Sequence, residues 1–177
     1  MTEWVALLRG VNVNGITIRS VDLAALLRDL GLSEVKTVLA SGNATFRSDD
    51  ELSARSDLKD RIEKGLRDRF GYDAWILLVA HHELAAAIDA FPFDDADADR
   101  QPYVVFCVDE HTRAELADAA ASLDASVDPV ASGAGVVYWN PPKGQSTDTP
   151  FAKIAARTTY KARTTTRNLR TLRKILG

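Results

Sequence analysis

Two short polar segments near the start of the chain have the residue types that bind anions. The first runs from Arg9 through the loop Gly10–Gly15, and the second is Ser41-Gly42-Asn43. Glycine lets backbone N–H groups approach a ligand without a side chain in the way, and successive exposed N–H groups form anion-binding concavities. Arg9 could add a planar, bidentate donor for phosphate or carboxylate. These segments predict a polar binding pocket, although they do not identify a reaction.

The same residue types also suit turns, because asparagine and glycine both tolerate positive φ. Asn12 and Asn43 could therefore contact a ligand or simply hydrogen-bond nearby backbone. We favour binding, since polar loops on rigid elements often carry function. The run from Gly10 to Gly15 is not a dinucleotide fingerprint, because it lacks the central glycine and no helix opens at its end. No cofactor is expected.

Apolar periodicity predicts the elements that would bring the two segments together. The expected order is strand 3–9, helix 20–30, strands 35–39 and 44–47, helix 58–70 and strand 75–79. This order is the split βαβ, or ferredoxin-like, arrangement. Its first two strands run the same way and its third lies antiparallel between them. The end of the first strand and the turn around Gly42 should therefore share one edge of the sheet.

A second copy of the pattern follows an acidic stretch, 94–101, that resembles a linker. The expected elements are strand 103–108, helix 112–123, strands 127–131 and 136–139, a helix opening at Thr149-Pro150 and an amphipathic helix 164–176. The predicted fold is α+β, with two related βαββα(β) ferredoxin-like subdomains, antiparallel sheets and a C-terminal helix. Subdomain 1–93 carries the short helix 82–90 at its end, and subdomain 102–177 follows the linker.

Charge is unevenly distributed along the chain. Residues 1–148 contain all 25 acidic residues and 14 of the 22 basic ones, whereas residues 149–177 contain eight basic residues and no acid. A basic end on an acidic body can attract anions. It could equally dock on the protein's own acidic surface, and charge alone leaves both interpretations open.

Other chemistry is weakly represented. Cys107 lies in an apolar strand and predicts an inert buried thiol, and as the only cysteine it allows no internal disulfide. His81-His82 lacks a third metal ligand, and the loop Lys143–Ser146 lacks P-loop spacing. We expect no metal site, no secretory signal and no membrane span, and a cytoplasmic location.

Four segments resemble one family, the domain of unknown function 1697 family (DUF1697). Leu7–Gly15 resembles its opening signature, leucine-arginine-glycine-isoleucine-asparagine-valine-glycine-glycine, although Asn14 replaces a glycine. Ser41-Gly42-Asn43 is similar to its second signature. Phe91-Pro92-Phe93 and Thr166–Thr171 resemble its later motifs, although Leu169 replaces a tryptophan.

The resemblance implies a bacterial α+β protein of two related subdomains and implies no activity. Carried over by matching positions, it implies these residues of interest: Arg9, Gly10, Asn12, Gly15, Ser41, Gly42, Asn43, Arg167 and Asn168.

These observations favour a binding protein for a phosphate-bearing ligand, either nucleic acid or a nucleotide. Arg9 and the loop amides would contact phosphate, and Asn12 and Asn43 would orient a sugar or base. Arg167, Asn168 and Arg170 would close or extend the pocket. One alternative is an enzyme on an anionic metabolite or nucleotide, with Arg9, Ser41 and Arg167 around the substrate, although no general base is evident. A second alternative is a dimerising structural protein. The oligomeric state is not predicted.

Overall fold

The computed structural model describes residues 1–9, 16–39, 42–73 and 75–177. The chain consists of two compact units. The first unit comprises Met1–Ala85 and Lys174–Gly177, and the second comprises Ala86–Arg173. The acidic segment 94–101, predicted to be a linker, therefore falls inside the second unit. There Arg173 forms an ion pair with Asp95.

The first unit contains a four-stranded antiparallel sheet with the order β2-β3-β1-β4. Its elements are β1 (Thr2–Leu8), α1 (Ser20–Asp29), β2 (Ser33–Thr37), β3 (Asn43–Ser48), the short 3-10 helix Leu52–Ala54, α2 (Arg55–Phe70) and β4 (Ile76–Ala80), followed by α3 (His81–Asp89), which crosses into the second unit. β3 lies antiparallel between β2 and β1, as the split βαβ arrangement predicts.

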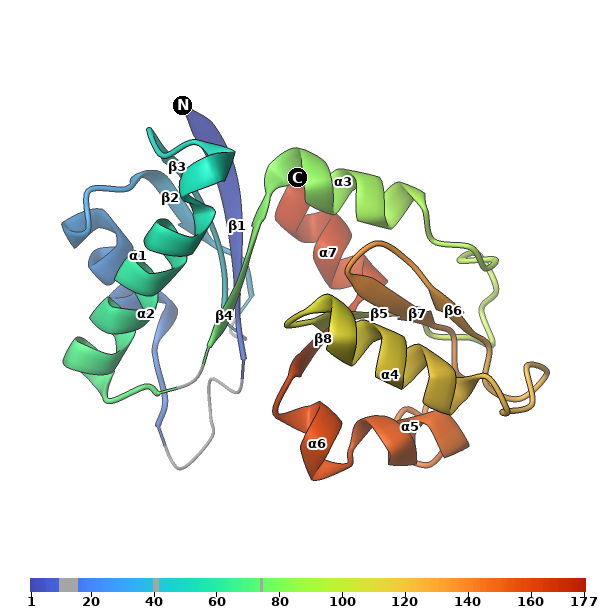
Figure 1. Ribbon diagram of the computed structural model, residues 1–177. Coiled ribbons are helices and arrows are strands. Elements are labelled where there is room, and N and C mark those ends of the chain that lie inside the picture. Colours follow the sequence, from blue (N-terminus) through green and yellow to red (C-terminus); the bar gives the residue numbers. More distant parts are fainter. Residues whose placement is uncertain (10–15, 40–41, 74) are drawn as a thin grey trace. The chain divides into compact units, whose positions relative to one another are not determined.

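The core of this unit forms between the sheet and the two helices that cover one of its faces (Figure 1). β1 is one of the two inner strands, and its alternate residues Trp4, Ala6 and Leu8 point into this core. The stripe Leu58, Ile62 and Leu66 of α2 is fully buried against it, as its four-residue spacing predicts.

The second unit repeats this strand order as β6-β7-β5-β8. Its elements are β5 (Tyr103–Cys107), α4 (Glu110–Ala120), β6 (Val130–Ser132), β7 (Val136–Trp139), α5 (Pro150–Ala155), α6 (Thr158–Lys161), β8 (Thr164–Asn168) and α7 (Leu169–Leu176), whose last residues belong to the first unit. Its core joins the sheet to α4 and α5. The fold is therefore α+β with two antiparallel sheets, as predicted.

One predicted element is wrong. Residues 164–176 do not form a single helix, because Thr164–Asn168 is the strand β8, which pairs antiparallel with β5. Threonine is β-branched, so the run Thr164-Thr165-Thr166 loses less side-chain freedom in a strand than in a helix. The helix is confined to Leu169–Leu176, where Leu169, Leu172 and Ile175 are buried.

Candidate functional site

The end of β1 and the turn between β2 and β3 lie side by side in the first unit. Leu7 is paired with Asn43 across β1 and β3, and the Leu8 backbone N–H donates to the Gly42 carbonyl at 2.8 Å. Arg9, the next residue, therefore leaves the sheet beside Gly42. The predicted juxtaposition is confirmed for Arg9, Gly42 and Asn43. The remaining candidates of this unit, Gly10, Asn12, Gly15 and Ser41, lie outside the described residues.

Asn43 closes the turn with both its backbone and its side chain. The Val38 N–H donates to the Asn43 carbonyl at 2.9 Å, and the Asn43 Nδ2 amide donates back to the Val38 carbonyl at 3.0 Å. The side chain is only 1% exposed. Of the two roles considered for Asn43, the hydrogen bond to nearby backbone is therefore present, and the residue positions the turn that Gly42 completes.

The backbone of this turn is strained at a residue that sequence reasoning did not single out. Leu39 has φ +61°, in the left-handed region that L-residues other than asparagine and aspartate rarely adopt, and Gly42 has φ +75°. The Leu39 side chain is also 49% exposed. Left-handed backbone at a bulky, exposed leucine raises the free energy of the folded state, and the other contacts of the turn must offset this strain. Backbone strain of this kind clusters at functional sites.

Tyr72 anchors the backbone on the other side of the candidate site. Its hydroxyl donates to the Arg9 carbonyl, and its ring is buried in the core of the first unit. α2 ends at Gly71, whose φ of +66° turns the chain back towards the sheet and brings Tyr72 under the end of β1. The contact links residues 63 positions apart in the sequence, so no local pattern could have revealed it.

Arg167 and Asn168 belong to the second unit, and each has local contacts there. The Arg167 guanidinium donates to Thr165 Oγ1 at 2.7 Å, and Asn168 Oδ1 accepts the Arg170 backbone N–H at 2.8 Å. Asn168 therefore caps the start of α7. Their predicted participation in a pocket with Arg9 stays a prediction.

The second unit has a counterpart of the candidate site at the end of β5. The Cys107 N–H donates to the Gly135 carbonyl at 3.1 Å, the equivalent of the Leu8 to Gly42 bond. Val108 therefore takes the position of Arg9. Asp109 follows immediately, and its carboxylate accepts the Thr112 N–H at 2.8 Å as the N-cap of α4. An acidic side chain occupies the helix start directly after the strand.

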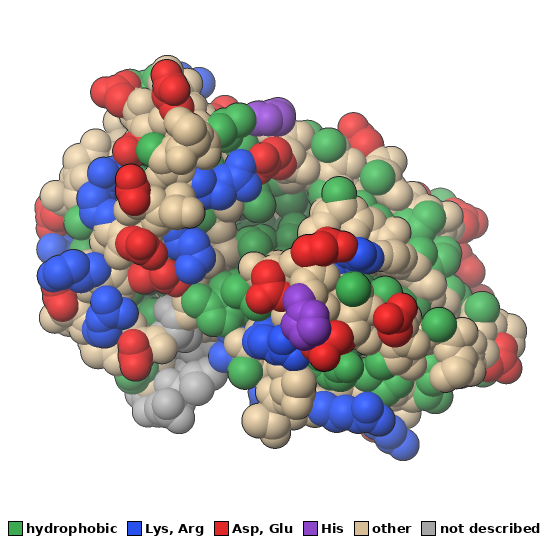
Figure 2. All heavy atoms as spheres, in the orientation of Figure 1, with side chains coloured by type: hydrophobic (Ala, Val, Ile, Leu, Met, Phe, Trp, Pro, Cys, Tyr) green, Lys and Arg blue, Asp and Glu red, His purple; other side chains and the backbone are tan. Residues whose placement is uncertain are grey.

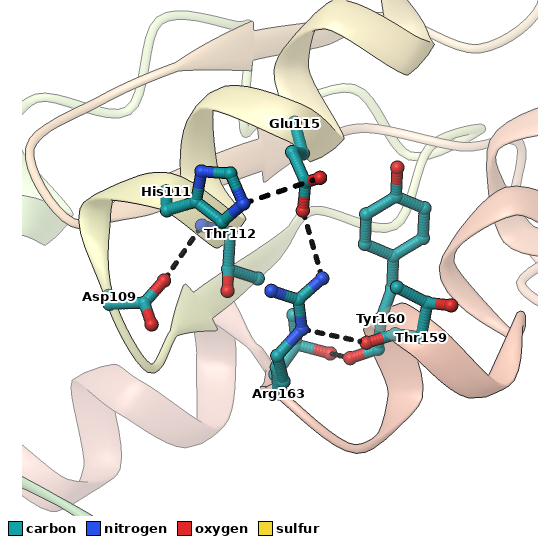
Figure 3. A network of polar contacts seen from close by, with 8 residues as sticks. Asp109, His111, Thr112, Glu115, Thr159, Tyr160 and Arg163 are labelled. Atoms are coloured by element: carbon teal, nitrogen blue, oxygen red, sulfur yellow. Dashed lines mark hydrogen bonds and ion pairs between the residues drawn. The ribbon is translucent and has the colours of Figure 1, made fainter.

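A polar network surrounds this counterpart (Figure 3). Arg163 donates to Glu115 at 2.9 Å and to the Thr159 carbonyl at 3.0 Å, and His111 lies 3.5 Å from Glu115. The Arg163 carbonyl accepts the Val108 N–H at 2.9 Å. The guanidinium at this sheet end is thus already paired with a carboxylate of the same unit.

Two titratable groups at the counterpart have shifted pKa values. Burial raises the pKa of the Cys107 thiol to about 12, so the thiolate is not accessible near neutral pH. The Thr112 N–H, which donates to Asp109, holds the pKa of that carboxyl below its ordinary value. Cys107 is therefore an inert, buried residue, as its apolar strand predicts.

Sequence reasoning missed one buried carboxyl. Asp128 is 1% exposed, and its two oxygens accept the Trp139 indole N–H at 2.5 Å and the Phe151 backbone N–H at 2.6 Å. It thus joins β7 to the start of α5, where Thr149 caps the helix by accepting the Ala152 N–H. A lone aspartate before Pro129 gives no signal of this role, which is structural.

Two antiparallel α+β units with one strand order, the first carrying a polar turn beside an arginine, define a two-subdomain α+β protein. The chain belongs to the family described as "Protein of unknown function (DUF1697)", whose model matches residues 1–138. Its fold is similar to the structure of the conserved bacterial protein SP0830 from Streptococcus pneumoniae. The two are 22% identical, with a TM-score of 0.82, over 99% of this chain and 97% of that one. No curated protein matches.

In the described part of the chain, no helix combines the length and apolar character that crossing a membrane requires. Nor do three or more histidine, cysteine, aspartate or glutamate side chains come together there in a group that could hold a metal ion.

Proposed function

We propose that the chain is a binding protein for a phosphate-bearing ligand, a nucleotide or nucleic acid, held at the end of β1. The observation that carries this proposal is the hydrogen bond from Leu8 to Gly42, which brings Arg9 beside a glycine turn. A guanidinium matches phosphate oxygens with two parallel donors, and a glycine leaves the neighbouring backbone open to them.

Each residue of the proposed site has a distinct task. Arg9 supplies the charge-assisted hydrogen bonds to phosphate. Asn43 and Tyr72 hold the backbone on either side, because both bond to main-chain carbonyls of the site. Four further residues are assigned to the proposed site from the sequence alone, because they lie outside the described part of the chain: Gly10, Asn12, Gly15 and Ser41. A rigid frame around a cation lowers the ordering cost of binding.

The test is a titration of the ¹⁵N-labelled protein with inorganic phosphate, adenosine monophosphate and acetate, followed by amide chemical shifts. We expect phosphate and the nucleotide to shift the amides of Leu8, Arg9 and Gly42, and acetate to act more weakly. Arg9→Gln should weaken nucleotide binding about tenfold or more, the loss of one charged hydrogen-bonding partner. Lys36→Gln, at an exposed lysine of β2 in the same sheet, is the matched control.

Two outcomes would overturn the proposal: shifts that avoid the end of β1, or equal losses in the Arg9→Gln and Lys36→Gln variants. Product formation in the same mixtures would instead favour the enzyme alternative. A cytoplasmic setting and a bacterial origin remain part of the proposal. The single cysteine supports the first, and the likeness to a conserved bacterial protein supports the second.

A further inference from the structure

A separate basic surface lies on the second unit, over α5 and α6. Lys153, Arg157 and Lys161 follow one another at four-residue spacing, and all three are exposed. Lysine and arginine side chains gather at the lower margin of the molecule in Figure 2, where Figure 1 shows α5 and α6. No acidic residue occurs from 149 to 177. The residues that α5 and α6 themselves contribute to the surface therefore carry a single sign of charge.

Two of these cations have no acidic partner in the part of the chain that the structure describes. Lys153 and Arg157 form no ion pair with any residue that the structure describes, whereas all six cations of α2 do so: Arg55, Lys59, Arg61, Lys64, Arg67 and Arg69. Two of the three carboxylates of α4, which packs with α5 in the same core, are engaged elsewhere, since Glu110 pairs with Arg113 and Glu115 with Arg163.

The basic end of the chain thus divides into two parts. Arg163 and Arg173 dock on acidic residues of their own unit, as one interpretation of the sequence expects. Lys153 and Arg157 instead keep their charge available at the surface, where it produces an attractive field for a polyanion.

The neighbouring side chains indicate which polyanion fits. Between the cations lie Thr158 and Thr159, both exposed, whose hydroxyls can donate to phosphate oxygens. From Lys153 to Ala162 the exposed residues are polar, charged or alanine, so the surface has no large apolar side chain to insert among lipid tails. An arginine fork, a lysine and two hydroxyls are the donors that proteins place along a nucleic-acid backbone.

We propose that the α5–α6 surface binds the phosphodiester backbone of a nucleic acid without reading its base sequence. The surface lies on the second unit and does not depend on the phosphate site proposed at the end of β1. The two proposals can therefore fail separately.

The test measures the affinity for a labelled oligothymidylate by fluorescence anisotropy, from about 50 to 200 mM salt. The variant Lys153→Gln/Arg157→Gln removes both unpaired cations. Its matched control, Lys64→Gln/Arg67→Gln, removes one lysine and one arginine from α2, so that both proteins lose the same charge. We expect the α5–α6 variant to bind about tenfold more weakly at the low-salt end. Its plot of log K against log salt should be shallower by about 1.4. The control should retain most of the affinity.

Several results would overturn the proposal. They are the absence of binding at low salt, an equal loss in the control variant, or tighter binding to anionic phosphatidylserine vesicles than to the oligonucleotide. The charge-conserving variant Lys153→Arg/Arg157→Lys must retain the affinity, which separates loss of charge from loss of folding. In an Arg9→Gln background, Lys153→Gln/Arg157→Gln must lower the affinity by the same factor as in the parent protein, which separates this surface from the site at the end of β1. A duplex of the same length distinguishes single-stranded from double-stranded partners.

Discussion

The ends of β1 and β5 begin with the same hydrogen bond and then diverge. In each unit a backbone N–H at the end of the strand donates to the carbonyl of a turn glycine, from Leu8 to Gly42 in the first unit and from Cys107 to Gly135 in the second. The connection to the next helix then spans residues 9–19 in the first unit but only Val108 and Asp109 in the second. The two units thus share the strand order but differ in the length of the connection that follows the strand.

The charged residues at the ends of β1 and β5 also differ. In the second unit, Asp109 caps α4 and Arg163 pairs with Glu115, so the local donors and the cation are satisfied within the unit. In the first unit, an arginine follows the strand directly, and the turn beside it holds a strained Leu39. Under the proposed function, one copy of the repeated fold binds the ligand, whereas the other uses its own carboxylates at the equivalent position.

The largest expected effect concerns the tryptophans of the two cores. The Trp139 indole N–H donates to Asp128, whereas the buried Trp4 indole N–H has no hydrogen-bond partner among the described residues. Asp128→Ala would leave the donors of Trp139 and Phe151 unpaired, which should lower the free energy of unfolding by about 3 to 5 kcal/mol. Urea unfolding followed by tryptophan fluorescence measures this loss.

Asp124→Ala, at an exposed carboxyl of the same loop, is the matched control, because its bonds to Ser126 face solvent. A loss no greater than that of the control would show that the buried carboxyl does not stabilise the second unit. It would also show that the Trp139 indole N–H can be buried without a hydrogen-bond partner, as the Trp4 indole N–H is among the described residues.

The next effect concerns Asp109, the N-cap of α4 directly after β5. The pKa of Asp109 is held below its ordinary value by the Thr112 N–H, so this carboxylate stabilises the fold fully above an unfolded pKa of about 3.9. That contribution is lost as the pH falls through the lower, folded pKa. Asp109→Asn retains an acceptor but not the charge. The variant should therefore melt below the parent protein at neutral pH and together with it in strong acid.

Thermal melting of the parent protein and Asp109→Asn across this acidic range provides the measurement, with Asp118→Asn, on the exposed part of the same helix, as control. A difference that persists unchanged at the lowest pH would contradict the assignment of Asp109 as a charged cap.

A smaller effect is expected for the contact between Tyr72 and the end of β1 in the first unit. Tyr72→Phe removes the hydroxyl that donates to the Arg9 carbonyl and should cost about 1 kcal/mol, the net contribution of one hydrogen bond. Hydrogen exchange at the Leu8 amide should accelerate, because this bond anchors the strand end. Tyr160→Phe is the control, since the Tyr160 hydroxyl makes no hydrogen bond with a described residue. Unchanged exchange at Leu8 would mean that the strand end does not depend on Tyr72.

Much of this architecture follows from local patterns in the sequence. The four-residue stripe of α2, the Thr149-Pro150 start of α5 and the turn at Gly42 each specify an element, and the order of the elements then specifies the sheet. The strand β8 escaped prediction because the amphipathic spacing around Leu169 extends backwards over the threonines. The contacts of Tyr72 and Asp128 escaped it for another reason, since they join positions far apart in the chain and depend on how the elements pack.

The smallest effect compares the two turns directly. The second unit places Gly135, with φ +71°, where the chain needs left-handed backbone, whereas the first unit also places Leu39 at φ +61°. Leu39→Gly should stabilise the protein by about 0.5 kcal/mol, because relief of left-handed strain exceeds the added entropy of glycine. Thr37→Gly, within β2, should instead destabilise it. If Leu39→Gly stabilises the fold yet weakens phosphate binding, the strain serves the site. If it leaves stability unchanged or lowers it, the leucine stores no strain and the two turns differ only in length.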